Sequence, residues 1–565
     1  MNFETLPTEI LLNVFSHFTG IDLLRTFYGL KFRLNEILHY QFEQCSFHFN
    51  TLSKGDFDHI CGEHLPRMAD CILNLHLSDH DETPTEIEQF LLLNPSFDRF
   101  TQLETFSVSD LRSYSTLIQI LGRCHQLNNL THLNLINGFF SDGDDRIDFQ
   151  MMIDQIWSLP RLVHCTLGIG IKGHSFRPPT RISSSLQSVS IDKFQIKLNQ
   201  LNSLIEHTPQ LTSLSISILS FLDNDHNLSP LPTLTELSIH SLVTCNASNM
   251  AILLQNTPNL VRLNVNLLTE LVDGNQWEEI IQTHLPNLTN FRLQMKFVTQ
   301  PAVNITERAT TLISSFETPF WLVQHQWFVH CLTQQRTIYL HTIPKSYDGD
   351  LPIGFRSTSH EHDELEFYSQ MKKLTPTFFN QPINPYIRMR KIEHLSINLS
   401  LPVHDRFREI VPDLTRLKSL TIHFHNNTFQ NQVQEIFNRA NHLYKLTIDQ
   451  HPSAHFPTAI FRYRNASIRQ LDLSNIPHLF NEDHCVEFAQ SPLGLQCEVL
   501  FINVTDCQSI LALAQRMPKL RVLNVRCKTE SSVPGDPLRW LRDRLPARCI
   551  VIRPPKLTCN ILLWI

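Results

Sequence analysis

A glycine-rich hexapeptide is the first stretch of this sequence whose residue types and spacing could do chemistry. The run from Gly168 to Gly173, GIGIKG, fits the Gly-x-Gly-x-x-Gly pattern of dinucleotide-binding turns. Such a turn binds phosphate because a helix starts on it and directs its N-terminal amides at the anion. Pro178 and Pro179 follow closely and prevent that helix. We therefore expect no nucleotide site and no cofactor.

The histidines and cysteines are the other candidates for chemistry. Among 29 histidines, the pairs His76/His80 and His451/His455 have a metal-ligand spacing, but each pair straddles a strand end or a proline-containing loop rather than one helical face. The 13 cysteines are isolated, without a Cys-x-x-Cys pair, which is typical of reduced thiols in a cytoplasmic and/or nuclear protein. No Gly-x-Ser-x-Gly, Walker or His-Glu-x-x-His motif is present. We expect no enzyme and no metal site; a triad scattered through the sequence is the enzyme alternative.

Composition narrows the class of partner. The 565 residues are 42% hydrophobic and 18% charged, with a net charge of −7. This balance gives no basic footprint for nucleic acid or an anionic membrane. No apolar run reaches the roughly 18–20 residues of a membrane span, and the opening stretch, which contains Glu4 and Glu9, does not have the features of a signal peptide.

A six-residue phrase, apolar-x-x-apolar-x-apolar, recurs along the chain. It predicts strands, and these strands would hold the polar residues in place. It reads LTHLNL from Leu130 and LTSLSI from Leu211, and successive copies start 23 to 32 residues apart, except for one gap between Leu288 and Ile392. Its last two apolar residues alternate with polar ones, as in a half-buried strand. The other clear and weaker copies start at Ile72, Leu103, Leu162, Leu186, Leu234, Leu260, Leu288, Ile392, Leu417, Leu443, Ile468, Cys497 and Leu520.

Helix-like stretches separate these phrases, for example around 201–207, 250–255, 277–282 and 510–516. A proline often stands two residues before the next phrase, where it ends the helix: Pro160, Pro209, Pro232, Pro258, Pro286 and Pro518. A strand–helix unit of this length buries its apolar face only by stacking on its neighbours. The sequence therefore predicts an α/β solenoid, with parallel strands on the concave face and helices or loops on the convex face.

The phrase resembles the leucine-rich repeat, over roughly residues 70 to 550. That family places Asn or Cys three residues after the last strand leucine, whereas this chain has apolar residues or glycine there, such as Leu111, Phe194 and Ile476. We expect an irregular solenoid with apolar plugs, its first half at 46–297 and its second half with a C-terminal cap at 390–565. Between them, 298–389 is read as degenerate repeats or, alternatively, an insertion that shapes a binding surface.

The outward strand positions form the predicted binding face. They are polar, rich in hydrogen-bonding groups and weakly charged, which suits an unknown protein substrate better than phosphate or lipid. A merely solvated sheet face is the alternative. The candidate residues are His132, Asn134, Ser215, Glu236, Ser238, Arg262, Asn264, Arg292, His394, Lys445 and Asp472.

The first 45 residues differ from the repeats. An apolar stripe steps by four from Leu6 to Phe18, with Leu11 and Phe15 beside it, and Pro7 and Glu9 suit a first helical turn. Gly20 is expected to break this helix and Asp22 to cap a second one, and a third segment follows through Leu38. Three short helices bury little by themselves and leave apolar surface exposed.

This segment resembles an F-box. Leu6-Pro7-x-Glu9-Ile10-Leu11, then Val14-Phe15 and Asp22-Leu23-Leu24, match that motif, while its later tryptophan is absent from FYGLKFRL, residues 27–34. The resemblance implies a three-helix domain, residues 1–45, of a substrate receptor in an SCF-type cullin–RING ubiquitin ligase. It implies docking on a Skp-type adaptor of the cullin complex through Leu6, Pro7, Ile10, Leu11, Val14, Phe15, Phe18, Leu23 and Leu24. The alternatives are helices that cap the solenoid's open end, a role compatible with docking, and a ligase-independent repeat scaffold.

Overall fold

The computed structural model describes residues 6–565 except 141–147, 172–174, 221–228, 242–245, 269–271, 301–303, 335, 344–352, 360–364, 366–367, 376–385, 399–404, 425–429, 452–460, 530–534 and 554–559. The chain divides into two compact units. Unit 1 contains Met1–Thr51, Asp56–Ile343 and Gly354–Thr358; unit 2 contains Leu52–Gly55, Pro344–Ile353 and Ser359–Ile565.

Unit 1 starts with three helices, α1 (Thr8–Phe15), α2 (Gly20–Phe27) and α3 (Phe32–Phe42). Gly20 begins α2 rather than simply ending α1, and the N-cap of α2 is Thr19, whose Oγ1 accepts a hydrogen bond from the Asp22 amide at 3.2 Å. The predicted cap, Asp22, instead lies in the first turn, where its carboxylate favours the positive helix end and accepts a hydrogen bond from Thr19 at 2.7 Å.

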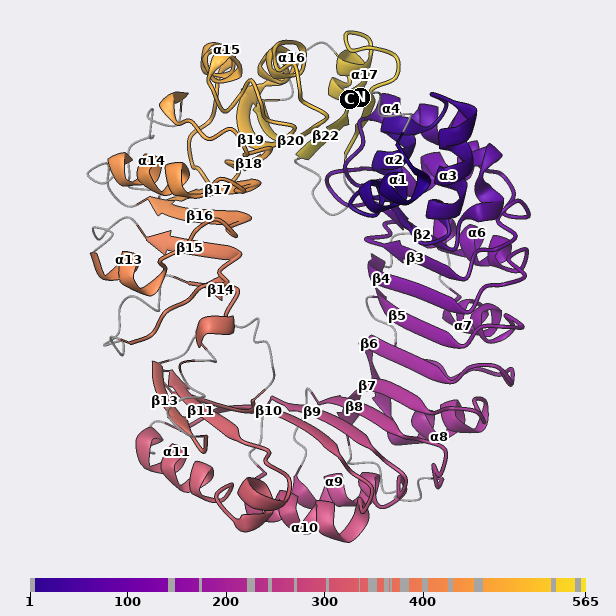
Figure 1. The fold of residues 1–565 in the computed structure, drawn as a ribbon, viewed down its shortest axis with the longest axis vertical. Helices are drawn as coiled ribbons and strands as arrows, with labels where there is room; N and C mark the ends of the chain where they lie inside the picture. Colours follow the sequence, from indigo (N-terminus) through magenta and orange to yellow (C-terminus); the bar gives the residue numbers. More distant parts are fainter. Residues whose placement is uncertain are drawn as a thin grey trace. The chain divides into compact units, whose positions relative to one another are not determined.

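A 13-stranded sheet follows in unit 1, in the order β1-β2-β3-β4-β5-β6-β7-β8-β9-β10-β12-β11-β13. From β1 to β10 each strand pairs in parallel with the next, as expected for stacked repeats (Figure 1). These strands are β1 (Ser46–His48), β2 (Asn74–Ser78), β3 (Thr105–Ser109), β4 (His132–Phe140), β5 (His164–Ile171), β6 (Ser188–Lys197), β7 (Ser213–Ser220), β8 (Glu236–Ser241), β9 (Arg262–Leu267) and β10 (Asn290–Val298).

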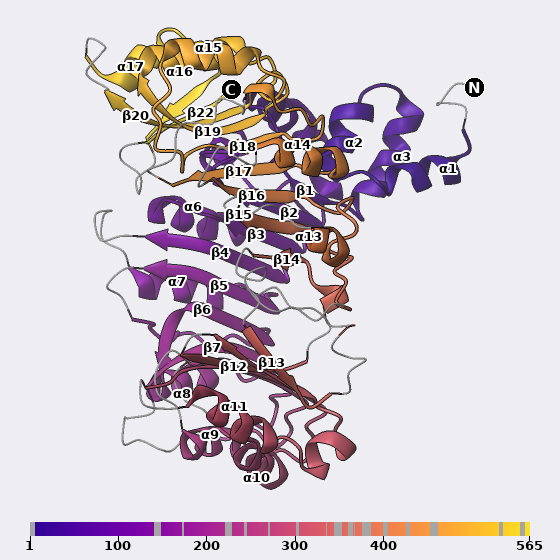
Figure 2. The same ribbon diagram turned by 90° about the vertical axis from the view of Figure 1, so that its left-hand side faces the viewer.

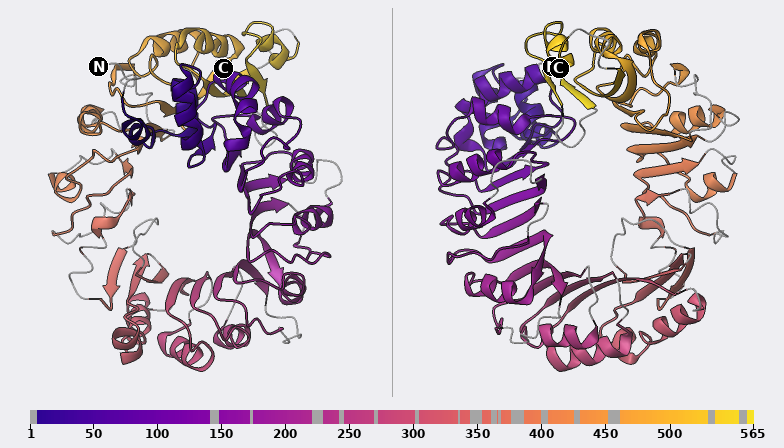
Figure 3. Two further views of the ribbon diagram at one scale, coloured as in Figure 1. Left: turned by 45° about the vertical axis from the view of Figure 1, so that its right-hand side comes forward. Right: turned by 180° about the vertical axis from the view of Figure 1, so that it is seen from behind.

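Helices cover one face of this sheet, and the strands leave the other face open, as both views of Figure 3 show. α4 (Lys54–His59) and short 3-10 and π turns over 60–71 connect β1 to β2. The covering helices are α5 (Glu86–Leu93), α6 (Tyr114–Cys124), α7 (Phe149–Trp157), α8 (Leu198–Glu206), α9 (Ala247–Leu254), α10 (Gly274–His284) and α11 (Ile305–Ser314).

The recurring phrase predicts the strands closely. In every copy the strand begins at the third residue, for example at His132 in β4 and at Ser213 in β7. The fourth and sixth residues, such as Leu133 and Leu135, are buried beneath the helices because strand side chains alternate. Helices α8, α9, α10 and α16 (Cys507–Arg516) also lie where the sequence predicts them.

The polar ladder between repeats lies at the second residue of the phrase rather than after the strand. Thr131, Thr212 and Thr235 each donate Oγ1–H to a main-chain carbonyl of the preceding repeat, at 3.2, 3.1 and 3.2 Å. Three residues after the last apolar residue of the phrase, Leu111, Phe194 and Ile476 are buried as apolar plugs, as the sequence predicts, although Phe194 lies within the longer strand β6. Stacking thus combines apolar burial with a hydrogen bond at the start of the strand.

The parallel order of the first sheet ends at β10. β12 (Thr337–Thr342) runs antiparallel to β10, and β11 (Val329–Gln334) runs antiparallel to β12. A π turn at Phe320–Gln324 precedes this hairpin, and β13 (Ile353–Ser357) ends the sheet. Trp321 is fully buried there and donates Nε1–H to the Gly274 carbonyl at 3.2 Å. β12 and β11 therefore form an antiparallel edge within 298–389.

Unit 2 contains a nine-stranded sheet, in the order β14-β15-β16-β17-β18-β19-β20-β22-β21. Its strands are parallel through β20, after which β22 and β21 are antiparallel. The strands are β14 (Lys373–Leu374), β15 (His394–Asn398), β16 (Ser419–Phe424), β17 (Lys445–Gln450), β18 (Gln470–Asp472), β19 (Val499–Asp506), β20 (Val522–Thr529), β21 (Ile550–Ile552) and β22 (Asn560–Trp564). Its helices are α13 (Asp405–Ile410), α14 (Gln430–Arg439), α15 (Glu482–Gln490), α16 and α17 (Pro537–Arg542).

Candidate functional site

The predicted adaptor-binding residues divide into a core and a surface. Leu11, Phe15, Leu23 and Leu24 are buried inside the three-helix segment, with at most 1% of each exposed. Pro7 is exposed, and Leu6 and Val14 are half-buried. Ile10 and Phe18 remain 47% and 39% exposed. A rigid partner reaches only the second group, while the first group holds the helices in place.

The spacing of the buried residues explains why the set divides into a core and a surface. Leu11 and Phe15 lie four residues apart, so they occupy one face of α1, and this face packs inward. Of the predicted stripe, Ile10 and Val14 occupy the neighbouring face of α1, whereas Leu6 and Phe18 lie just outside the helix. The ring of Phe27 contacts the ring of Phe18 edge to face, with ring centroids 5.7 Å apart. The exposed apolar side chains are therefore fixed by a packed interior.

Two further apolar side chains are exposed where the sequence departs from the F-box pattern. Leu30 is 60% exposed and Phe32, at the start of α3, is 78% exposed. Sequence reasoning missed Phe32 because it lies outside the stripe formed by Leu34, Ile37 and Leu38, which are buried. The signal that could have found Phe32 is an aromatic residue at a position outside the helical periodicity of the buried residues of α3.

The three helices also close the first edge of the sheet, and Figure 2 shows them beside β1 and β2. A Cβ atom on Gly20 would lie 3.0 Å from the Phe47 ring and 3.2 Å from Cys45 Cβ, so α2 approaches β1 closely. Phe42 of α3 packs on Phe47 with ring centroids 5.5 Å apart. The capping role predicted as an alternative is thus present in unit 1.

The open face of the first sheet presents two continuous rows of polar side chains. One row pairs Glu236, Arg262 and Asn290 across β8, β9 and β10, and the neighbouring row pairs Ser238, Asn264 and Arg292. Of the eleven predicted binding residues, all are half-buried or exposed. Their role in binding stays a prediction.

Six of these residues line a single hollow of 250 Å³ over β7 to β10. Arg262 forms an ion pair with Glu236, whereas Arg292 forms no ion pair with the described residues. Hydroxyl and amide groups surround the two guanidinium groups, which suits recognition of a polar peptide with an acidic residue. The six residues are Ser215, Glu236, Ser238, Arg262, Asn264 and Arg292.

His132 and Asn134 lie on the same face but on β4, away from this hollow. His132 stacks on His164 of β5, with ring centroids 4.2 Å apart and planes at 16°. Burial and the neighbouring His132 lower the pKa of His164. His394, Lys445 and Asp472 lie in unit 2, on β15, β17 and β18, so they belong to a different sheet.

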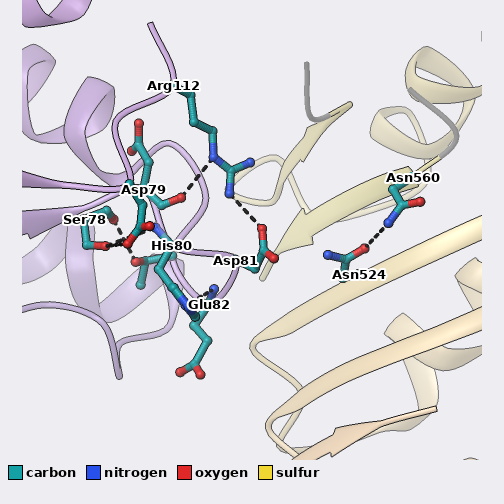
Figure 4. A network of polar contacts seen from close by, with 10 residues as sticks. Ser78, Asp79, His80, Asp81, Glu82, Arg112, Asn524 and Asn560 are labelled. Carbon is teal, nitrogen blue, oxygen red and sulfur yellow. Dashed lines mark hydrogen bonds and ion pairs between the residues drawn. The ribbon is translucent and has the colours of Figure 1, made fainter. Parts of the chain in front are cut away.

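A cluster of acidic residues follows β2, and the sequence analysis did not single it out. Arg112 donates Nε–H to the Asp79 carbonyl at 3.0 Å and pairs with Asp81 at 2.8 Å (Figure 4). The Glu86 carboxyl is fully buried and accepts a hydrogen bond from the Ser78 amide at 2.9 Å. Burial raises the pKa of Asp79 to about 7 and that of Glu86 to about 8.

The other candidates for chemistry do not converge. Gly168 and Gly170 lie inside β5, where a Cβ on Gly168 would meet the Leu135 carbonyl at 3.2 Å; residues 172–174 lie outside the described residues. His76 is on β2 with Nε2 3.2 Å from Ser109 Oγ, and His455 lies outside the described residues. In the described part of the chain, no group of three His, Cys, Asp or Glu side chains is placed to hold a metal ion.

Nor does any helix of the described ranges have the length and apolarity of a membrane-spanning segment.

No protein-family model matches the chain, and no curated protein matches its sequence. A chain of the yeast Rad7–Elc1 complex is similar at 12% identity, over 94% of this chain and 100% of that one, with a TM-score of 0.22. A chain of the mouse RP105/MD-1 complex is 14% identical over 79% and 70%, with a TM-score of 0.26.

A chain of the Drosophila Toll–Spatzle complex is 12% identical over 86% of this chain and 62% of that one, with a TM-score of 0.23. At TM-scores this low, the similarities carry no further inference about this chain.

Proposed function

We propose that this protein is the substrate-recognition subunit of an SCF-type cullin–RING ubiquitin ligase, located in the cytoplasm and/or nucleus. In this proposal α1 to α3 dock on a Skp-type adaptor, and the polar faces of the sheets bind a protein substrate. The chain makes and breaks no covalent bond itself, because ubiquitin transfer belongs to the other subunits.

The observation that carries this proposal is the apolar surface of the helices. Ile10, Phe18, Leu30 and Phe32 are exposed although the interior beneath them is filled by Leu11, Phe15, Leu23 and Leu24. Several exposed apolar residues on one small segment are typical of a protein-binding surface. The F-box resemblance places the docking residues on the same segment.

The polar face supports the receptor half of the proposal. A hollow with one paired and one unpaired arginine, flanked by serine and asparagine, selects partners by hydrogen bonds and charge rather than by apolar area. Docking and selection therefore use two surfaces of different chemistry.

Affinity co-purification in the presence of a proteasome inhibitor tests the proposal. We expect the full chain to retain a Skp-type adaptor and a cullin, and a variant with Ile10→Asp and Phe18→Asp to lose both. The matched control is Val298→Asp with Val323→Asp, since these side chains are 61% and 71% exposed elsewhere in unit 1. An intact chain that retains no adaptor would contradict the proposal.

A ligase-independent scaffold is the second candidate, because the helices pack against β1 as a cap. It predicts that the same double change leaves every co-purifying partner in place.

A further inference from the structure

Unit 2 contains a hollow beside β19 and β20 whose lining includes none of the eleven predicted binding residues. Its volume is 570 Å³, within the range of about 300–1,000 Å³ that ligand cavities occupy. One wall is the segment 474–479, which follows β18, and the other is formed by Asn503 of β19 and by Arg526 and Lys528 of β20.

Two cations line this hollow. Arg526 and Lys528 are two residues apart on β20, so both side chains point to the same side of the strand. Both are exposed. Neither forms an ion pair with the described acidic residues. Two neighbouring like charges repel each other, which makes an anion between them favourable.

The acidic side chains on the adjacent strands have other partners. Asp449 accepts a hydrogen bond from Asn475 Nδ2 at 2.7 Å and lies 3.2 Å from His423 Nδ1. Asp472 accepts hydrogen bonds from the Ser474 amide at 3.0 Å and from its hydroxyl at 2.6 Å. Among the described residues, neither carboxylate is therefore the ion-pair partner of Arg526 or Lys528.

The facing wall is held in position by main-chain contacts. Asn503 Nδ2 donates to the carbonyls of Ser474 and Ile476 at 2.7 and 3.0 Å. The Phe480 amide donates to the Asn503 carbonyl at 2.9 Å. A ligand consequently meets a preformed wall and orders little of the protein on binding.

That wall is partly apolar. Pro477 is exposed and Leu479 is half-buried, and both line the hollow. A ligand that fills the space thus meets cations on one side and hydrocarbon on the other.

We propose that Arg526 and Lys528 bind an oxyanion, a phosphoryl or carboxylate group, whose attached apolar group lies against Pro477 and Leu479. A guanidinium group matches the planar geometry of either oxyanion, and the ammonium group adds a point charge. This site is independent of adaptor docking by α1 to α3.

Isothermal titration of the full chain with phenyl phosphate, inorganic phosphate and benzoate tests the site. We expect phenyl phosphate to bind most tightly, because it has both the charge and the apolar group. Inorganic phosphate tests the charge alone, and benzoate tests whether a carboxylate replaces the phosphoryl group.

The variant Arg526→Gln with Lys528→Gln should weaken phenyl phosphate binding at least tenfold, about the effect of losing one charge-assisted hydrogen bond. The matched control, Arg516→Gln with Lys519→Gln, removes two exposed positive charges from the same unit and should bind as the wild type does. Equal melting temperatures of the three proteins establish that the fold is retained.

Three results would overturn the proposal: no binding of any probe, equal weakening by both double variants, or equal affinity for phenyl phosphate and inorganic phosphate. The first two remove the site, and the third removes the apolar contact with Pro477 and Leu479.

Discussion

The helices α1 to α3 and the polar face of the first sheet present opposite chemistry to solvent. The helices expose Ile10, Phe18, Leu30 and Phe32 over a filled interior, whereas the sheet exposes serine, asparagine, arginine and glutamate over buried leucines. An apolar surface gains affinity from area removed from water, and a polar surface gains selectivity from matched hydrogen bonds. The comparison indicates that one surface suits a constant partner and the other a selected one.

The largest expected effect concerns the interior of the helices. Phe15→Ala should destabilise the three-helix segment by about 3–5 kcal/mol, because Phe15 is fully buried and leaves a cavity. Hydrogen exchange should increase across 8–42 and remain unchanged across the sheet face at 213–292. The control Ile10→Ala, at an exposed position, should leave exchange in both regions as in the wild type. Unchanged exchange in Phe15→Ala would show that this packing is wrong.

A pH titration tests the buried carboxyl groups beside β2, which belong to neither surface. Asp79 and Glu86 have pKa values raised to about 7 and about 8, above their unfolded values, so the folded state binds more protons. Their contribution to stability is complete at acid pH and is lost as pH rises toward 8. These two carboxyl groups by themselves should lower the free energy of unfolding by on the order of 2 kcal/mol between pH 6.5 and 8.

Buried histidines act in the opposite direction at lower pH. Burial lowers the pKa of His76 and of His341 to about 4, so their contribution is lost as pH falls below about 6.5. These histidines still contribute just above pH 6.5, where the unfolded imidazoles are partly protonated, so a comparison with a carboxyl variant is needed to isolate the carboxyl groups. Glu86→Gln should flatten the slope in that window, measured by denaturant unfolding and by exchange over 74–93. An unchanged slope would contradict the assignment to Glu86.

A third pair of substitutions tests how far the apolar docking surface extends along the helices. Leu30→Asp with Phe32→Asp should weaken adaptor binding roughly tenfold if these residues replace the contact of the absent tryptophan. Titration with purified adaptor measures this effect, with Val298→Asp and Val323→Asp as the control. Wild-type affinity in the Leu30 and Phe32 variant would restrict the docking surface to α1 and the turn after it, which contains Phe18.

The smallest expected effect on stability is on the sheet face. Arg262→Ala removes the ion pair with Glu236, in which the side chains are 58% and 37% exposed. It should cost under about 1 kcal/mol of unfolding free energy, because exposed ion pairs are weak. Co-purification of the substrate should nevertheless decrease, whereas Arg308→Ala, an exposed change on α11, should leave it unchanged. Equal substrate recovery from both variants would contradict a binding role for the hollow.

The sequence predicts the repeats well because their signal is local. Each strand starts at the third residue of its phrase, and alternation alone determines that Leu133 faces the core while Asn134 faces solvent. The threonine ladder was not predicted, because the second residue of a phrase looks like any polar turn residue until its neighbour is stacked on it. The antiparallel edge at β11 and β12 depends on long-range pairing, which has no local period.

The candidate site was predicted only in part for a related reason. In α1, two neighbouring faces are apolar, and periodicity cannot tell that Leu11 and Phe15 rather than Ile10 and Phe18 pack inward. The grouping of six polar residues in one hollow follows from strand register, which the repeat supplies. Glu86 was missed because the local sequence does not distinguish a buried glutamate from a solvent-exposed one.

The most direct test of the account is the affinity of the full chain for a purified Skp-type adaptor, measured by isothermal titration. We predict that the wild type and the Val298→Asp, Val323→Asp control bind equally, and that Ile10→Asp with Phe18→Asp binds at least about a hundredfold more weakly, since two apolar anchors are lost. Equal affinity of all three proteins, or no binding by the wild type, would contradict the central claim that α1 to α3 form the docking surface.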